Sequence, residues 1–165
     1  VEPAASNAFI IYEKGAAALR SPGLTQFVAD FTVNLHRGEG FRFIFRTNVK
    51  DLGNHPSIVF DYTSEGSFVR ENGVPVAADE NIKAGIRKPV RIQLTNDGKE
   101  VKISVDCQTI YYSHTQSEAT EYVVIESLNE SAGVISGIEF AEILDANLEY
   151  YIKDRHDFLL QYRKY

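Results

Sequence analysis

The fold is decided by one stretch of the sequence, Phe27-Val28-Ala29-Asp30-Phe31-Thr32-Val33-Asn34-Leu35-His36. Every odd-numbered residue in this stretch is apolar, and most of the even-numbered residues are polar. Successive side chains of a β-strand point to opposite faces of a sheet, so the alternation predicts a strand with one buried face. Phe41-Arg42-Phe43-Ile44-Phe45-Arg46 repeats the pattern and places its phenylalanines on one face. The glycine-rich link between them, residues 37–40, predicts a short hairpin loop.

Further strands are expected at short intervals on both sides of this stretch. The expected ranges are 9–13, 17–20, 57–63, 67–71, 90–95, 100–105, 109–113, 122–126 and 134–143. Asn96-Asp97-Gly98-Lys99 and Glu71-Asn72-Gly73-Val74 contain residue pairs that accept the positive φ angles of tight turns, so each predicts an antiparallel hairpin. The first two ranges are expected to pair with each other and to supply a sheet edge.

The pattern as a whole predicts an all-β domain, an antiparallel two-sheet jelly-roll sandwich over residues 1–143. Roughly ten short strands with turn signals every 8–12 residues are typical of a sandwich or a barrel, and a closed single barrel is the alternative. From Leu144 onward the apolar residues recur at close to helical spacing, with acidic residues early and basic residues late. Residues 144–165 are therefore expected to form a C-terminal helix packed on the sandwich, or a connector to a following domain.

Composition and charge exclude several classes of function. The net charge is −6, whereas a nucleic-acid-binding protein needs a basic surface to neutralise phosphates. No run of 18 apolar residues is present, so no membrane span is expected in this segment. Cys107 is the only cysteine and cannot form an internal disulfide. The chain begins at Val1 and stops within a helical pattern at Tyr165, so we expect it to be one part of a longer protein with other domains.

Two segments carry a resemblance to a known fold family. Residues 88–106, a strand, a tight turn and a second strand, are similar to the paired central strands of laminin-G-like and concanavalin A-like jelly rolls. Residues 133–140 resemble the glycine-containing closing strand of this superfamily, and the likeness extends over residues 8–143. It implies a lectin, adhesion or glucanase type of domain. The chain departs from the family in having Cys107 where a glycine recurs, and in having no tryptophan to stack on a sugar, although nine tyrosines are available.

Catalytic signatures are absent from the sequence. Glycosidases of related jelly rolls use carboxylates two residues apart on a strand, which share a face and lie about 5 Å apart. Glu139 and Glu142 are three residues apart and would point to opposite faces. The four histidines lack the spacing of a zinc site. We therefore expect no enzyme and no cofactor, although the oxygen-rich loops at residues 48–55 and 79–81 suit calcium as well as they suit solvated loops.

The polar faces of the strands supply the candidate ligand-binding residues. Arg42 and Arg46 are expected to share the face opposite the phenylalanines. His36, Asp61 and Arg91 are expected on the outer faces of their own strands. If these strands lie in one sheet, the five residues form a polar platform suited to hydroxyls or carboxylates. The alternative is a solvated face with cross-strand ion pairs.

The sequence favours a non-catalytic recognition module that binds glycan or acts in adhesion within a larger extracellular or cell-surface protein. Its expected partners are a glycan or protein ligand, with no nucleic acid. A structural domain that docks other proteins through a sheet edge or the C-terminal helix is the second hypothesis. An enzyme acting on sugars is the third, and the missing carboxylate pair argues against it.

Overall fold

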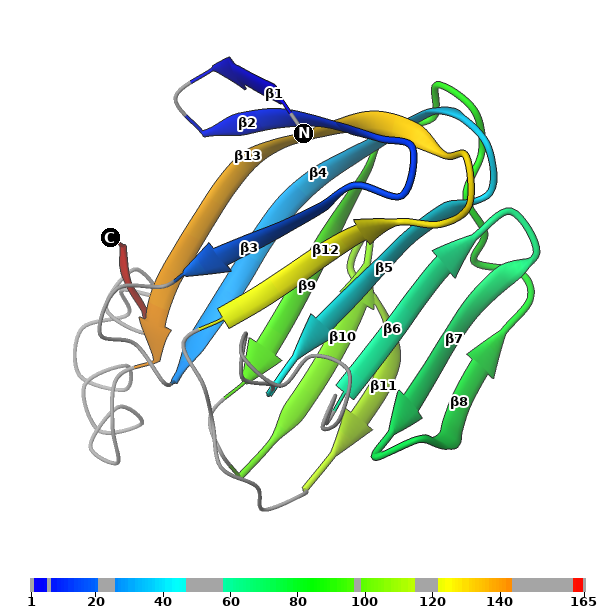
Figure 1. The fold of residues 1–165 in the computed structure, drawn as a ribbon. Coiled ribbons are helices and arrows are strands. Elements are labelled where there is room, and N and C mark those ends of the chain that lie inside the picture. The colour runs from blue at the N-terminus through cyan, green and yellow to red at the C-terminus, as the bar shows by residue number, and fades with distance from the viewer. Residues whose placement is uncertain are drawn as a thin grey trace.

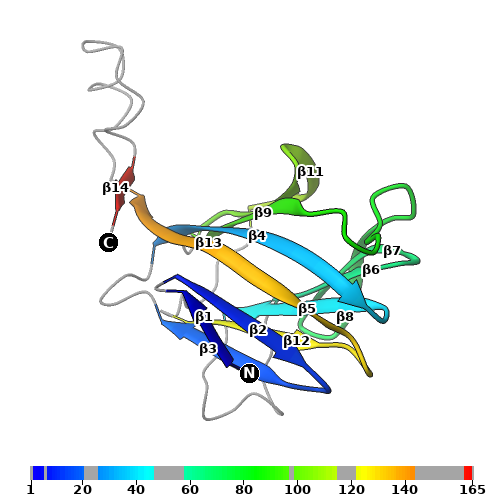
Figure 2. The ribbon, with the colours of Figure 1, turned by 90° about the horizontal axis from the view of Figure 1, so that it is seen from above.

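The protein is a sandwich of two antiparallel β-sheets, which Figure 1 shows face-on and Figure 2 shows as two layers. The computed structural model describes residues 2–5, 7–20, 26–46, 58–96, 99–114, 122–143 and 162–164. Within these residues no helix is present, and none is therefore long and apolar enough to cross a membrane.

The larger sheet has eight strands, and the smaller sheet has six. The order in the eight-stranded sheet is β1 (Glu2–Ala5), β2 (Ala8–Tyr12), β13 (Ala132–Ile143), β4 (Phe27–Arg37), β9 (Val90–Asn96), β10 (Val101–Val105) and β11 (Gln108–Ser113), with β14 (Tyr162–Lys164) paired to β13. The order in the six-stranded sheet is β3 (Ala16–Arg20), β12 (Tyr122–Ser127), β5 (Gly40–Phe45), β6 (Ile58–Thr63), β7 (Gly66–Glu71) and β8 (Val74–Asp79).

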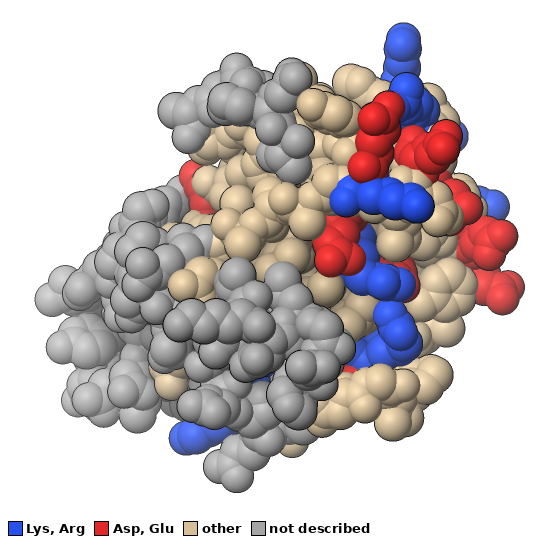
Figure 3. Space-filling view, viewed as in Figure 1, with Lys and Arg blue, Asp and Glu red and all other residues tan. Residues whose placement is uncertain are grey.

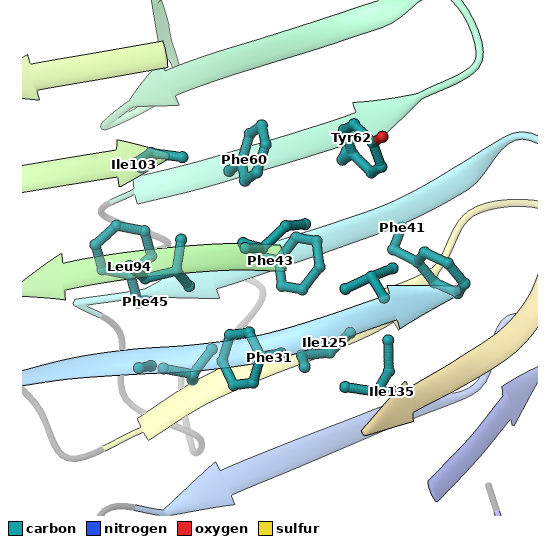
Figure 4. Close-up of a cluster of buried hydrophobic side chains, with 14 of the residues drawn as sticks. Phe31, Phe41, Phe43, Phe45, Phe60, Tyr62, Leu94, Ile103, Ile125 and Ile135 are labelled. Carbon is teal, nitrogen blue, oxygen red and sulfur yellow. The ribbon is translucent and has the colours of Figure 1, made fainter. Parts of the chain in front are cut away.

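The core lies between the two sheets and is rich in phenylalanine, as Figure 4 shows. The odd-numbered residues of β4, from Phe27 to Leu35, are at most 3% exposed, and the alternation in the sequence is thereby confirmed. Phe31 of the eight-stranded sheet stacks on Phe43 of the six-stranded sheet with 6.0 Å between ring centroids. Phe43 in turn stacks on Phe60 of β6 at 5.7 Å. The contact between Phe31 and Phe43 therefore joins the two sheets across the core.

The two hairpins predicted from the turns at residues 96–99 and 71–74 pair as expected. Strands β9 and β10 are antiparallel neighbours, although turn residues 97 and 98 lie outside the described residues. Strands β7 and β8 are joined through Asn72 and Gly73, whose φ angles are 49° and 80°. Both angles are positive, as a tight turn between twisted strands requires. The all-β sandwich predicted from the sequence is confirmed.

Two predicted pairings are wrong because the chain crosses between the sheets. Strands β4 and β5, expected to form a hairpin, lie in different sheets, as do β2 and β3. Gly40 begins β5 at a φ of 151°, and a Cβ there would lie 2.0 Å from the carbonyl oxygen of Tyr62. Only glycine fits this close approach of β5 to its sheet neighbour β6. The link predicted as a hairpin is instead a crossing from the eight-stranded to the six-stranded sheet. Of the expected N-terminal edge pair, only β3 forms an edge.

The C-terminal helix is not confirmed. Of residues 144–165 the structure describes only Tyr162–Lys164, which form β14 and pair with Ala141 to Ile143 of β13. The rest of the expected helix or connector lies outside the described residues. Two strands were also missed, β1 and β8. Pro75 lies within β8, and a proline weakens the strand signal because it cannot donate a hydrogen bond to a neighbouring strand.

Candidate ligand-binding face of the six-stranded sheet

A row of directly opposed residues crosses the outer face of the six-stranded sheet. Its members, from β3 to β8, are Ala16, Glu126, Arg42, Asp61, Phe68 and Ala78. Each alternates with a core residue on its own strand, as Arg42 does with Phe41 and Phe43. The pairing register of five neighbouring strand pairs therefore places a charged trio beside an aromatic ring.

Arg42 and Asp61 form a two-point ion pair at the centre of this row. The Nε atom of Arg42 donates to Oδ1 of Asp61 at 2.7 Å, and Nη2 donates to Oδ2 at 3.0 Å. The hydrogen bond to Asp61 raises the pKa of Arg42 above its ordinary value, with burial opposing the shift and the charges of Asp61 and Glu126 adding to it. The expected cross-strand partner of Arg42 is therefore present, and both groups are held in fixed positions.

The outer face of this sheet is hollowed over β5, β6, β7 and β8. The hollow has a volume of about 870 Å³, and its lining includes Glu39, Arg42, Asp61, Glu65, Phe68 and Arg70. Figure 3, which looks onto this face, shows basic and acidic side chains gathered together on the right-hand part of the view. A volume of roughly 300–1,000 Å³ is usual for sites that bind small molecules. The hollow is thus large enough for a ligand of several rings.

Phe68 and Arg70 are the lining residues that the sequence interpretation missed. They lie on β7 on either side of the buried Val69, so both point outward. Phe68 is partly exposed and stands directly opposite Asp61 in the register. Arg70 approaches Asp61 with 3.9 Å between Nη2 and Oδ2. The alternation of residues 67–71 carried the signal, because it places Phe68 on the outward face where apolar residues are not expected.

Arg46 does not share the outer face with Arg42, and this expectation is wrong. It follows the last residue of β5 with a φ of 56°, which ends the alternation of the strand. Its side chain is 2% exposed. The Nε atom donates to Oδ1 of Asn96 at 2.7 Å, and Nη2 donates to the carbonyl oxygen of Glu100 at 3.3 Å. Arg46 therefore ties β5 to residues of the opposite sheet.

Arg91 and His36 lie on the other side of the sandwich. Their strands, β9 and β4, belong to the eight-stranded sheet, which forms the other layer of the sandwich in Figure 2. Asp30 accepts hydrogen bonds from Nε of Arg91 at 2.9 and 3.0 Å and from Nε2 of Gln93 at 3.2 Å. The bond to Asp30 raises the pKa of Arg91. The single platform of five residues is therefore wrong, and only Arg42 and Asp61 come together.

A second, smaller hollow lies on the outer face of the eight-stranded sheet. Its volume is about 330 Å³, and Gln93, Lys102 and Tyr112 are among its lining residues. The hydroxyl of Tyr112 donates to Oε1 of Glu100 at 3.0 Å, so this ring is already held by a neighbour. The hollow on the six-stranded sheet is the larger and is the stronger candidate.

The described residues supply no metal site. Among them, no group of three or more histidine, cysteine, aspartate or glutamate side chains lies close enough together to hold an ion. In the candidate calcium loop at residues 79–81, Oδ1 of Asp79 accepts a hydrogen bond from the backbone N–H of Asn81 at 2.9 Å. This bond is that of an ordinary turn. The other candidate loop, residues 48–55, lies outside the described residues.

Comparisons with known proteins identify the fold. No protein-family model matches the chain, and no curated protein matches it by sequence. Among solved structures, the Ca²⁺/Man-bound exoplasmic/lumenal domain of VIP36 aligns with a TM-score of 0.59 at 7% identity, over 84% of each chain. The carbohydrate-binding module CBM66 from Bacillus subtilis aligns with a TM-score of 0.51 at 12% identity, over 82% of each chain.

A sialidase aligns with a TM-score of 0.61 at 8% identity, over 89% of this chain but only 17% of the sialidase. Identities this low show the fold alone. The expected resemblance to concanavalin A-like jelly-roll domains is thereby confirmed at the level of the fold.

Proposed function

We propose that this chain is a non-catalytic recognition module that binds glycan in the hollow of the six-stranded sheet. One observation carries the proposal: a partly exposed aromatic ring, Phe68, adjoins a fixed pair of hydrogen-bonding groups, Arg42 and Asp61, inside a hollow of about 870 Å³. A sugar ring presents an apolar face of C–H groups and an edge of hydroxyls. An apolar surface with a few fixed polar groups matches both parts.

The chemistry of the hollow suits hydroxyl groups. Asp61 has lone pairs beyond those that Arg42 occupies, so its carboxylate can accept from a ligand hydroxyl. Arg42 uses Nε and Nη2 for Asp61, and its other N–H groups remain for a ligand oxygen. Because the ion pair holds both side chains in place, binding would immobilise few additional rotamers. A preformed site of this kind supports recognition of a sugar edge.

The same arrangement supports a role without catalysis. Hydrolysis of a glycosidic bond normally needs two carboxylates, one of them a proton donor with a raised pKa. Asp61 is the acidic residue on the floor of the hollow, and both of its oxygens already accept hydrogen bonds from Arg42. Glu39 and Glu65 lie in two separate turns at the rim. No two acidic residues of this lining are two apart on one strand, which is the carboxylate spacing of glycosidases on related jelly rolls.

The setting we propose is a recognition or adhesion domain within a longer, cell-surface or secreted protein. Two of the similar structures are described as a carbohydrate-binding module and as an exoplasmic/lumenal domain. In the sialidase, the matching region is 17% of the chain, so a domain of this fold is one part of a larger protein there. These likenesses support the setting, and the hollow supports the ligand class.

The test is a glycan array followed by titration calorimetry on the full chain. We expect binding to a defined set of glycans, and we expect Phe68→Ala and Asp61→Asn each to weaken it at least tenfold, about 1.4 kcal/mol. Lys102→Ala is the matched control, because Lys102 lines the hollow on the opposite sheet. An array without binding, or equal losses in all three variants, would contradict the proposal. Hydrolysis of any bound glycan would contradict its non-catalytic part.

A protein-interaction role has one specific observation in its favour. Strand β8 is an edge of the six-stranded sheet and exposes Val74 and Val76, which are 60% and 39% exposed. Exposed edge strands can pair with another chain. Val76→Lys would block such pairing without altering the hollow. If the wild type self-associates in sedimentation and Val76→Lys does not, with glycan binding intact, the result would support this second role.

A further inference from the structure

We propose that the ligand in this hollow carries a carboxylate, and that Arg70 is the residue that binds it. This inference rests on the proposed glycan-binding function and specifies the class of sugar, an acidic sugar such as a hexuronic acid. It follows from three features of the hollow: the hydrogen bonding of its two arginines, the distribution of its charges along the strands, and the buried apolar cluster beside Arg70.

Arg70 differs from Arg42 in that none of its N–H groups donates to an acceptor among the described residues, whereas Arg42 already gives two hydrogen bonds to Asp61. Its side chain is 40% exposed, and its closest carboxylate oxygen, Oδ2 of Asp61, lies 3.9 Å from Nη2. This separation is too long for a hydrogen bond. Both oxygens of Asp61 already accept from Arg42 at 2.7 and 3.0 Å. Within the described part of the chain, the guanidinium of Arg70 therefore has an ionic neighbour but no hydrogen-bond acceptor.

The charges of the hollow are separated along the strands. Glu39 and Glu65 lie in turns at one end, where Thr63 of β6 pairs with Gly66 of β7. Arg70 lies four residues further along β7, about 13 Å from that end at the usual rise of a strand. The Arg42–Asp61 pair between them is neutral as a unit. Among the lining residues, an anionic group is thus attracted to the Arg70 end and repelled from the turn end.

Buried apolar side chains beside Arg70 favour an ion pair there. Val59 stands directly opposite Arg70 in the register and forms a buried cluster with Ile44 and Val124 on this outer face. These three side chains are at most 5% exposed. Charges interact more strongly next to apolar surface than in open water, because the local dielectric constant is lower. A ligand carboxylate would therefore bind Arg70 more strongly than it would bind an arginine fully exposed to water.

The geometry fits a carboxylated sugar better than a carboxylate alone. Phe68 and Arg70 project from the same face of β7 about 7 Å apart. A sugar ring over Phe68 would place a ring substituent near Arg70 and hydroxyls near Asp61. The planar guanidinium presents parallel N–H groups that match the two oxygens of a carboxylate. The hollow therefore combines the apolar ring of Phe68, the carboxylate of Asp61 as an acceptor for sugar hydroxyls, and the guanidinium of Arg70 as a donor to a sugar carboxylate.

Matched sugars provide the test. Titration calorimetry on the full chain would compare galacturonic and glucuronic acid oligosaccharides with galactose and glucose oligosaccharides of the same linkage, and with their sulfated forms. We expect at least one uronic acid to bind tenfold or more tightly than its neutral counterpart, and this preference to shrink as salt rises. Sulfated sugars that bind as tightly as the uronic acids would overturn the carboxylate assignment.

Variants identify the residue responsible. Arg70→Gln should lower the preference for the uronic acid over the neutral sugar at least tenfold and leave the affinity for the neutral sugar within about twofold. Arg70→Lys should retain only part of the preference. Lys102→Gln, which removes one positive charge from the opposite sheet, should leave the preference intact, and melting curves check that each variant folds.

The outcomes separate this inference from the proposed function. Equal binding of neutral and acidic sugars would overturn the inference while the glycan-binding proposal stands. A preference that survives in Arg70→Gln would also overturn it. Binding to neither kind of sugar would refute the proposed function and the inference together.

Discussion

Two arginines on one strand should respond in opposite ways to replacement by alanine. Arg42 and Arg46 are four residues apart and were expected on one face, but the structure places Arg42 at the hollow and Arg46 inside the sandwich. Arg46→Ala should therefore lower stability without a specific effect on the ligand. Arg42→Ala should weaken ligand binding and have little effect on stability.

The magnitudes follow from the contacts of each side chain. Arg46 bonds Oδ1 of Asn96 and the carbonyl of Glu100, and each lost bond to a charged group costs about 1.5 kcal/mol, or about 3 kcal/mol together. In a domain of this size that lowers Tm by roughly 6–12 °C. Arg42 is 31% exposed, and such surface pairs are worth at most about 1 kcal/mol. Arg70, 3.9 Å from Asp61, can also take over part of the pairing.

The assay is thermal and urea unfolding of both variants beside the wild type, followed by circular dichroism. The two substitutions remove the same side chain from the same strand, so each is the control for the other. A Tm for Arg46→Ala within 2 °C of the wild type would refute the buried bonding described for it. An equal loss in Arg42→Ala would show that the Arg42–Asp61 pair is mainly structural.

Three further predictions concern the backbone and one buried hydroxyl. Gly40→Ala should lower stability by about 3 kcal/mol or more, since the added Cβ would lie 2.0 Å from a carbonyl oxygen. Gly73→Ala should lower stability by only about 1 kcal/mol, because nothing lies within 4 Å of its Cβ and only the positive φ opposes the substitution. Melting curves of the two variants test the difference. Cys107 has a φ of 66° beside Asp106 at 46°, so Cys107→Gly should raise stability by about 0.5–1 kcal/mol, and a lowered Tm would contradict the strained turn. Burial raises the pKa of Tyr62 to about 12, so its contribution to stability is complete below pH 10, the ordinary value, and is lost as the pH rises towards 12. In Tyr62→Phe the free energy of unfolding should fall less steeply between pH 9 and 12 than in the wild type. An equally steep fall in the variant would contradict this role of Tyr62.

Local sequence patterns were sufficient to predict most of the strands. Alternation in residues 27–36 and 41–46 reports which side chains are buried, and this depends only on the geometry of a single strand. The Asn72-Gly73 turn was readable for the same reason, because its positive φ angles are a property of two residues. Strand β8 was missed although that turn implies a partner strand, because Pro75 and the two alanines, Ala77 and Ala78, weakened its strand signal.

The candidate site could be predicted only in part. Arg42 and Asp61 were identified because both alternate with core residues, and the register then placed them directly opposite each other. Phe68 and Arg70 complete the hollow, and their outward position was readable, but their proximity to Asp61 was not. That proximity depends on the alignment of β6 with β7, which a single strand does not record.

What the sequence determined by itself is the face of each strand that is buried, the main turns and the absence of a paired-carboxylate motif at strand spacing. What only the tertiary structure decided is the sheet to which each strand belongs. A strand with one apolar face packs equally well from either side of a shared core, so the phenylalanines of β4 and β5 satisfy the same pattern in one sheet or in two. In the structure β4 and β5 lie in different sheets, and this separates Arg42 and Asp61 from His36 and Arg91. The inward position of the Arg46 side chain also depends on the tertiary structure. Its backbone φ of 56° lies just past the end of β5, where the two-residue alternation of a strand no longer applies.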